Sequence, residues 1–396
     1  MNWRLIPELT GAEGHRWQTG HMAELMLVLV LGLVGPVLAV NKRFAIPVAV
    51  GEILAGVLFG VSGFKVIDPT QPNLALLSQI GFALVMLVTG SHIDVRKIFR
   101  LSNTRKALLN VVSTSVAAVA VSLGVVGVTH VGGNFATYAV IIASSSAAVV
   151  LPSFASRESS PKLAIFVTQV TIADLLAIVL LPVVTGSKNL LSVGIGAASV
   201  TVASGGIYLL LRYAASSGAW KRTRKFSAAN GLGLELRLSL ILLLGLILLA
   251  QSFAVTIMIS GFGLGLALGA NGMPKRLAKQ LFAVSEGLFS PIFFVLLGAG
   301  INVSAVAQDP KLIGLALALG LGAIAVHLIP AMFGLDPLLA VASSAQLGVP
   351  AAAVSIGLAT HVLSSGEAAA IMLGALTTLA ATAIAAAARN RKAQTV

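Results

Sequence analysis

Long apolar segments alternate with short polar ones along nearly the whole of this 396-residue chain. A helix needs about 20 predominantly apolar residues to cross the hydrocarbon core of a bilayer. We identify thirteen segments near that length, at residues 22–40, 44–63, 74–91, 107–130, 135–155, 162–186, 190–214, 236–251, 253–270, 281–301, 312–334, 337–360 and 368–388. The pattern predicts an all-α polytopic membrane protein with about 13 transmembrane helices.

One division in this series needs an argument. Residues 236–270 form a single apolar-rich stretch, which as one helix would be about 52 Å long and too long for an ordinary span. We therefore place a break at Gln251-Ser252. With this break, all but five of the 26 Lys and Arg residues fall on one side of the membrane, the exceptions being Arg4, Arg16, Lys65, Lys188 and Lys311.

This charge distribution predicts the orientation of the chain. Positive residues concentrate in cytoplasmic loops, so we expect the N-terminus outside and the C-terminus in the cytoplasm of a cell (inner) membrane. Residues 1–21 are then an extracytoplasmic segment, 22–388 the membrane domain and 389–396 a cytoplasmic tail. The basic stretch 218–235 is interpreted as a solvated cytoplasmic loop.

Composition limits the classes of function. Hydrophobic residues make up 57% of the chain and charged residues only 10%, and the mean hydropathy is +0.98. The net charge of +13 is explained by cytoplasmic loops, so we expect membrane lipid and no nucleic acid as a partner. The chain has no cysteine, which excludes disulfides, thiolate metal sites and a catalytic cysteine; we expect no cofactor.

Two short stretches resemble each other, residues 143–152 (ASSSAAVVLP) and 342–350 (ASSAQLGVP). If 190–214 is a linker helix, repeats of six spans lie at about 22–186 and 236–388, and the two stretches occupy equivalent spans of opposite direction. Such inverted repeats often carry broken helices at mid-membrane. We expect an unwound crossing at Ser144, Ser145, Ser146, Ser343 and Ser344; the alternative is close helix packing through small residues.

Ionisable residues within spans are costly and usually functional. Asp174 lies near the middle of 162–186 with apolar neighbours. A carboxylate at that depth can hold a proton or a small cation, but hardly both, and this competition is the basis of cation/proton exchange. The alternative is a structural carboxylate that is hydrogen-bonded between helices.

Three further residues are candidates with weaker support. His327 lies near the middle of 312–334 and either pairs with Asp174 when no cation is bound, acting as a pH sensor, or is merely packed. Glu52 follows a glycine in the second span, where a structural role competes with ion contact, and Thr171 is a possible accessory ligand. Glu286 is interpreted as an interfacial anchor.

Other classes of function fit less well. A membrane hydrolase could use a serine with His327 and Asp174, but the chain has no G-x-S-x-G elbow, so we do not expect an enzyme. A sodium-coupled symporter of a small organic anion could share the broken-helix architecture, but no Lys or Arg lies at mid-depth to bind the anion. A membrane sensor that transports nothing is the remaining alternative.

Three segments resemble the monovalent cation:proton antiporter-2 family, which includes potassium-efflux transporters. They are residues 46–60 (IPVAVGEILAGVLFG), 77–90 (LSQIGFALVMLVTG) and 291–298 (PIFFVLLG). The resemblance implies the sodium/proton antiporter fold, a scaffold that dimerises, a core with two crossed unwound helices, and exchange of Na⁺ or K⁺ for protons by alternating access. It places the family's ion-binding aspartate at Asp174.

The chain departs from the family pattern at three places. Ala173 stands where many members have a polar or acidic residue before the aspartate, His327 where members usually have lysine, and residues 345–348 (AQLG) where they have a charged motif. One carboxylate and one imidazole suggest electroneutral exchange of one cation for one proton.

Overall fold

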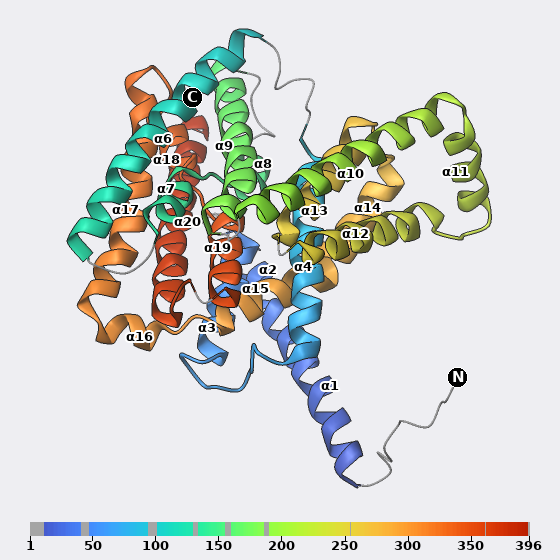
Figure 1. Cartoon of the computed structure of the whole chain (residues 1–396), viewed down its shortest axis with the longest axis horizontal. Coiled ribbons are helices and arrows are strands. Elements are labelled where there is room, and N and C mark those ends of the chain that lie inside the picture. Colours follow the sequence, from blue (N-terminus) through green and yellow to red (C-terminus); the bar gives the residue numbers. More distant parts are fainter. Residues whose placement is uncertain are drawn as a thin grey trace.

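The computed structural model describes residues 12–40, 47–93, 101–129, 134–154, 160–185, 190–253, 255–360 and 362–394. Within these ranges the regular elements are all helices (Figure 1). They are α1 (Ala12–Gly32), α2 (Val34–Val40), α3 (Val48–Phe59), α4 (Pro72–Ser91), α6 (Leu101–Thr129), α7 (Phe135–Ala143), α8 (Ala147–Phe154), α9 (Pro161–Thr185), α10 (Leu190–Ser216), α11 (Ala219–Ala229), α12 (Leu234–Ser252), α13 (Ile257–Ala270), α14 (Lys275–Val284), the π-helical segment η1 (Ser285–Phe289), α15 (Ser290–Ala299), α16 (Val303–Gln308), α17 (Pro310–Met332), α18 (Pro337–Ala342), α19 (Gly348–Ala359) and α20 (Ser365–Gln394).

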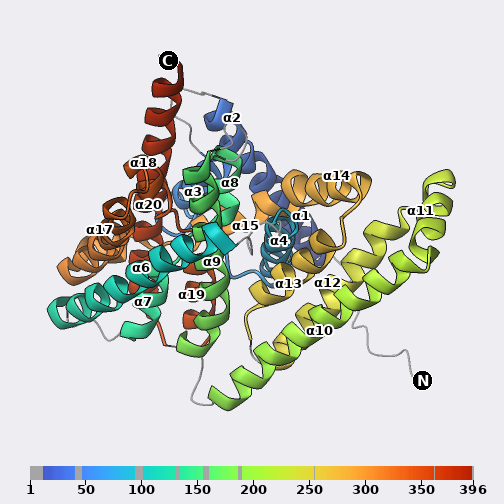
Figure 2. The same cartoon turned by 90° about the horizontal axis from the view of Figure 1, so that it is seen from above.

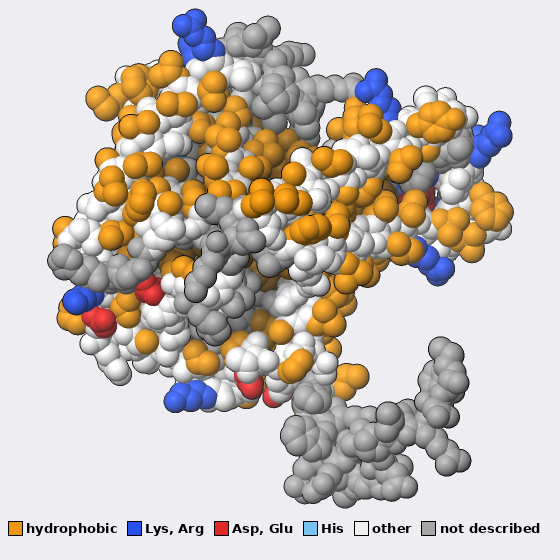
Figure 3. All heavy atoms as spheres, viewed as in Figure 1, with side chains coloured by type: hydrophobic (Ala, Val, Ile, Leu, Met, Phe, Trp, Pro, Cys, Tyr) orange, Lys and Arg blue, Asp and Glu red, His pale blue; other side chains and the backbone are white. Residues whose placement is uncertain are grey.

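The lengths and composition of these helices fit a bilayer. In the described part of the chain, nine helical stretches are long and apolar enough to span a membrane, and three shorter apolar helices accompany them. Hydrophobic side chains are spread widely over the face in Figure 3, whereas Lys and Arg side chains lie toward its edges. The prediction of an all-α polytopic membrane protein is confirmed.

The apolar stretch 236–270 forms two helices, as its length required. Helix α12 ends at Ser252, and the hydroxyl of Thr256 accepts a hydrogen bond from the amide of Met258 (3.3 Å) to begin α13. The break therefore follows Gln251-Ser252 instead of falling on it.

Many of the basic residues from which the orientation was predicted lie outside the described residues, namely Arg4, Lys42, Arg43, Arg96, Lys97, Arg100, Arg157 and Lys188.

Two predicted polar segments are helical. Helix α1 begins at Ala12, so the second half of the expected N-terminal segment extends the first span. The basic stretch 218–235 was expected to be a solvated loop. It contains α11, and side-chain contacts hold this helix against the start of α12. Ser227 Oγ donates to the buried Glu235 carboxylate (3.0 Å), and Arg224 Nε lies 3.9 Å from its other oxygen. These two contacts explain why the segment folds despite its polarity.

The helices form two groups that meet along α9 (Figures 1 and 2). In one group α17 packs on α20 and α6, and α6 packs on α7 and α9. In the other, α4 packs on α13 and α15, α3 packs on α15, and α10 packs on α12 and α13. Helix α9 touches α10 and α13, and α8 touches α4. Asp174 on α9 and His327 on α17 lie in the first group, whereas Glu52 on α3 lies in the second.

Glycines let helices of the second group approach closely. A Cβ at Gly261 would strike the carbonyl oxygen of Ala83, and one at Gly265 would strike that of Leu87. Small residues at membrane helix interfaces allow such contact between backbones. The pair α4–α13 is therefore held by van der Waals packing of main chain on main chain.

Candidate functional site

Two helices of the first group are broken at the predicted serines. Helix α7 ends at Ala143, residues 144–146 are not helical, and α8 begins at Ala147. Helix α18 ends at Ala342, and α19 begins at Gly348. The prolines that suggested the breaks, Pro152 and Pro350, lie within the second halves, so the breaks do not fall at the prolines themselves.

Serines close the end of the first half of each broken helix, and one serine connects the two breaks. Ser144 Oγ donates to Ile141 O and Ser343 Oγ to Ala340 O, both at 2.7 Å. Each hydroxyl adds to the backbone amide of the same serine, which also donates to that carbonyl group, so the last turn of each first half is closed locally. Ser145 Oγ instead donates across the crossing to Ser343 O (2.6 Å). The two breaks, far apart in sequence, therefore touch.

Gln346 makes a second connection between the breaks. Its Nε2 lies 2.6 Å from Ile141 O and 3.3 Å from Ile142 O, and its backbone amide donates to Thr378 Oγ1 (3.2 Å). The side chain is 1% exposed. A neutral amide thus supplies hydrogen bonds to the last carbonyl groups of α7 from the opposite break.

Asp174, on α9, lies beside the N-terminus of α8, the second half of the first broken helix. Its Oδ2 accepts a hydrogen bond from the amide of Ala147, the first residue of α8 (3.1 Å), and the side chain is 5% exposed. A helix N-terminus favours negative charge through its free N–H groups. Among the described residues, no Lys, Arg or His forms an ion pair with Asp174.

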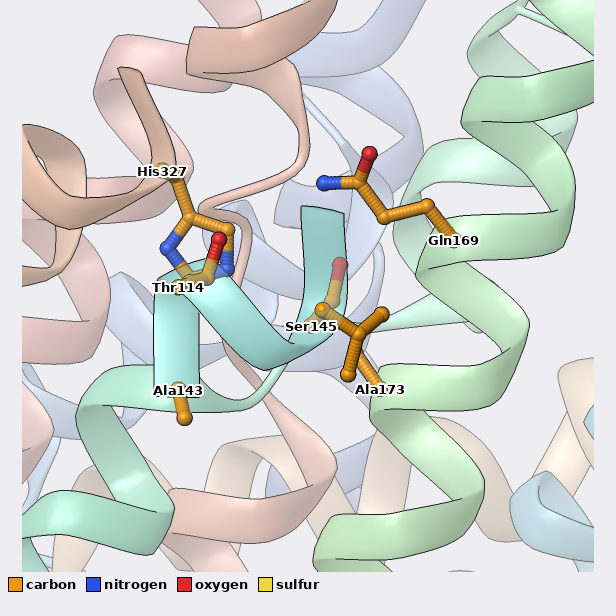
Figure 4. Close-up of a pocket in the computed structure, with 7 residues that line it drawn as sticks. Thr114, Ala143, Ser145, Gln169, Ala173 and His327 are labelled. Carbon is orange, nitrogen blue, oxygen red and sulfur yellow. The ribbon is translucent and has the colours of Figure 1, made fainter. Parts of the chain in front are cut away.

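His327 faces a different set of groups. Its Nδ1 lies 2.8 Å from Ala323 O, and the ring is 1% exposed. Because a carbonyl group only accepts hydrogen bonds, Nδ1 carries the hydrogen and Nε2 of the neutral ring is an acceptor. The ring lines a small pocket together with Val111, Thr114, Ala143, Ser145, Gln169 and Ala173 (Figure 4). The expected ion pair with Asp174 is not formed in this conformation.

The two accessory candidates are engaged elsewhere. Thr171 Oγ1 donates to Val167 O of its own helix (2.8 Å). Glu52 is 2% exposed on α3, which packs on α1, α2 and α15. The structure therefore does not bring Glu52 to the crossing with the serines.

Buried neutral amides also belong to the site, although the sequence analysis named only charged, titratable and hydroxyl side chains. Besides Gln346, the buried pair Asn110 and Gln169 joins α6 to α9, with Asn110 Nδ2 donating to Gln169 Oε1 (2.9 Å). Each is a polar residue within an apolar segment, and this is the signal that could have identified them. The partners of each amide could not be inferred from sequence.

Comparisons with known proteins agree with this architecture. Residues 26–394 match the family described as "Sodium/hydrogen exchanger, transmembrane". A protein of Bacillus subtilis (strain 168) named "Putative Na(+)/H(+) antiporter YjbQ" is 25% identical over 380 residues, which cover 90% of this chain and 61% of that protein. The chain thus spans less than two thirds of this relative's length. Because the family match extends over nearly the whole chain, the chain belongs to the transmembrane sodium/hydrogen exchanger family of multi-pass membrane antiporters.

Proposed function

We propose that the protein exchanges Na⁺ or K⁺ for protons by alternating access, with proton and cation competing for Asp174. The observation that carries the proposal is the buried carboxylate at the N-terminus of α8, where one oxygen is held by the amide of Ala147. The other oxygen is available to a proton or to a cation. Oxygen atoms of the adjoining break, Ser144 to Ser146, are candidates for the remaining ligands, because hard cations prefer oxygen.

The charge inventory of the crossing favours an electroneutral cycle. Asp174 is its one carboxylate within the described residues, and Gln346 adds hydrogen bonds without charge. Binding one cation in place of one proton then leaves the site with the same net charge.

We further propose a homodimer in the cell membrane. The mass of the detergent-solubilised complex, corrected for bound detergent, would test this proposal.

Replacing Asp174 by Asn tests the proposal directly. The amide keeps the shape of the side chain but loses both the titratable proton and the negative charge that balances the cation. We expect Asp174→Asn to abolish the cation-dependent pH change inside proteoliposomes on addition of Na⁺, K⁺ or Li⁺. Exchange near the wild-type rate would contradict the mechanism.

Asp309→Asn is the matched control. Asp309 Oδ1 accepts from the amide of Lys311 at the start of α17 (2.9 Å), and Asn caps a helix as well as Asp does. This variant should exchange at the wild-type rate.

The same liposomes test the alternative function. Cation-driven uptake of an organic anion by the wild-type protein, without proton counter-movement, would favour the symporter.

A further inference from the structure

The hydroxyl of Thr114 departs from the rule that other threonines of this protein follow. A helical threonine usually donates to the carbonyl group four residues earlier, as do Thr89, Thr129, Thr168, Thr171, Thr185, Thr201 and Thr377. Thr114 is 3% exposed, and its Oγ1 has no hydrogen-bond partner in the part of the chain that the structure describes.

The local sequence explains why Thr114 is free. Its ordinary acceptor is the carbonyl oxygen of Asn110, which accepts the hydroxyl of Ser113 at 2.9 Å. That oxygen also receives the helical N–H of residue 114, so both of its lone pairs are used. The Thr114 hydroxyl therefore turns to the pocket that it shares with His327 (Figure 4).

The other polar groups of the pocket also have hydrogen-bonding positions that no described residue fills. Ser145 gives its hydroxyl hydrogen to Ser343 O and keeps lone pairs. His327 Nε2 has a lone pair because Nδ1 carries the ring hydrogen. Gln169 uses Oε1 for Asn110, and its Nε2, which points into the pocket in Figure 4, has no acceptor among the described residues.

These unpaired donors and acceptors fit a water molecule. Buried polar groups without partners are costly and usually indicate water or an ion. A water molecule could accept from Gln169 Nε2 and Thr114 Oγ1 and donate to His327 Nε2 and Ser145 Oγ, which gives it the two to four partners that buried waters have. A bare cation would face the N–H₂ group of Gln169 and is less suited.

The pocket adjoins the proposed ion site through two chain connections. Ala173, which lines the pocket, precedes Asp174, and Ser145 belongs to the break that leads into Ala147. In this conformation the space among the side chains is too narrow for a water molecule. A water could therefore enter only when the broken helices or α6 move apart.

We propose that Thr114, Ser145, Gln169 and His327 form a water-binding site that opens beside the crossing and gives protons a hydrogen-bonded path to Asp174. The path to Asp174 rests on the proposed function, whereas the water site does not. The first test therefore measures water access and not transport.

The absence of cysteine from the chain makes that access measurable. Ag⁺ travels in water and binds thiols, so we expect Ag⁺ to protect the thiol of Thr114→Cys from maleimide labelling after denaturation. Thr168→Cys is the matched control, because Thr168 is 5% exposed but lies outside the pocket. Protection of both thiols, or of neither, would overturn the proposal.

A second measurement needs no substitution. Hydroxyl radicals made from water by brief X-ray exposure oxidise side chains beside bound water, so His327 should be oxidised although it is 1% exposed. The exposed His92 is the internal standard. An oxidised His92 with an unmodified His327 would show that no water reaches the pocket.

Transport then tests the proton path. Thr114→Val keeps the shape but removes one hydrogen bond to the water, and we expect exchange about two- to tenfold slower with an unchanged KM for the cation. Thr114→Ser should restore the rate, and Thr168→Val should leave it unchanged. A wild-type rate for Thr114→Val would overturn the path. If Ag⁺ reaches Thr114→Cys but wild-type protein exchanges no cation for protons, the water site stands and the proposed function fails.

Discussion

At the scale of single residues, Gln346 connects the two broken helices without adding charge. Its amide hydrogens reach the carbonyl oxygens of Ile141 and Ile142 from the opposite break. A carboxylate in the same place would turn two hydrogen bonds into two repulsive contacts between oxygens. The geometry therefore depends on a hydrogen-bond donor at this position and not only on the size of the side chain.

Gln346→Glu turns that dependence into a pH effect. A protonated glutamic acid can still donate one hydrogen bond to Ile141 O, whereas the ionised form cannot. We expect exchange by Gln346→Glu to be retained at acidic pH and to fall as the pH rises, and exchange by Gln346→Leu to be low at every pH. Proton flux measured against pH for both variants checks this.

Gln251→Glu serves as the control, since Gln251 is exposed and its side chain, within the described residues, bonds to Gln79 alone (3.3 Å). Its pH profile should match that of the wild type. If Gln346→Glu and Gln346→Leu had the same profile, Gln346 would only fill space.

His327 is expected to set the pH at which exchange begins. A proton on its ring would place a positive charge beside the break that holds Asp174 and would repel the entering cation. In the same surroundings a lysine keeps its proton to a higher pH than a histidine does. We therefore expect His327→Lys to begin exchange at a more alkaline pH than the wild type, and His327→Ala to lose this part of the pH profile.

Proton flux against pH in identical liposomes compares the three proteins. Among the described residues His327 bonds only to Ala323 O. Among the described side chains, the other titratable groups on α17 and on the helices packed against it, or at the N-caps of these helices, are Arg105, Lys106, Tyr138, Asp309, Lys311, Asp336, Glu367, Arg389 and Arg391. Superimposable profiles would mean that His327 is merely packed.

At the scale of elements, the contact between α4 and α13 depends on missing side chains. Gly265 leaves no room for a Cβ against Leu87 O. We expect Gly265→Ala to force the helices apart at a cost of about 1–3 kcal/mol and to lower the thermal unfolding midpoint in detergent. Gly245→Ala on α12 meets no atom within 4 Å, and its midpoint should not fall. Equal midpoints would show that α4 and α13 adjust freely.

The elements differ in how far sequence predicted them. The apolar segments and the serine-rich breaks were predictable, because length, hydropathy and small polar residues are local properties. The helix α11 was not, because the pairing of Ser227 with Glu235 depends on how the chain turns back. The orientation of His327 and the partners of Gln346 were also unpredictable, since each depends on a helix distant in sequence.

At the scale of the whole molecule, the charge distribution predicts which side each loop faces. Asn230 follows α11 on the predicted cytoplasmic side, and Lys311 begins α17 on the other. In the cysteine-free chain, a membrane-impermeant maleimide applied to intact cells should label Lys311→Cys and not Asn230→Cys. Cells opened by lysis should show labelling of both. The reverse pattern in intact cells would invert the orientation.

The contact between the two breaks also constrains how the chain is made. Ser145 and Ser343 are separated by 198 positions, and Gln346 reaches back 205 positions to Ile141. Polar backbone groups without partners are not tolerated in lipid. Ser145 Oγ and Ile142 O take their partners from the second break, so the first broken helix has no complete set of partners while the ribosome is still making the second half. It follows that the nascent first half must wait near the translocon or beside a membrane chaperone until residue 346 has emerged. A protein truncated before that point should be a substrate for membrane proteases.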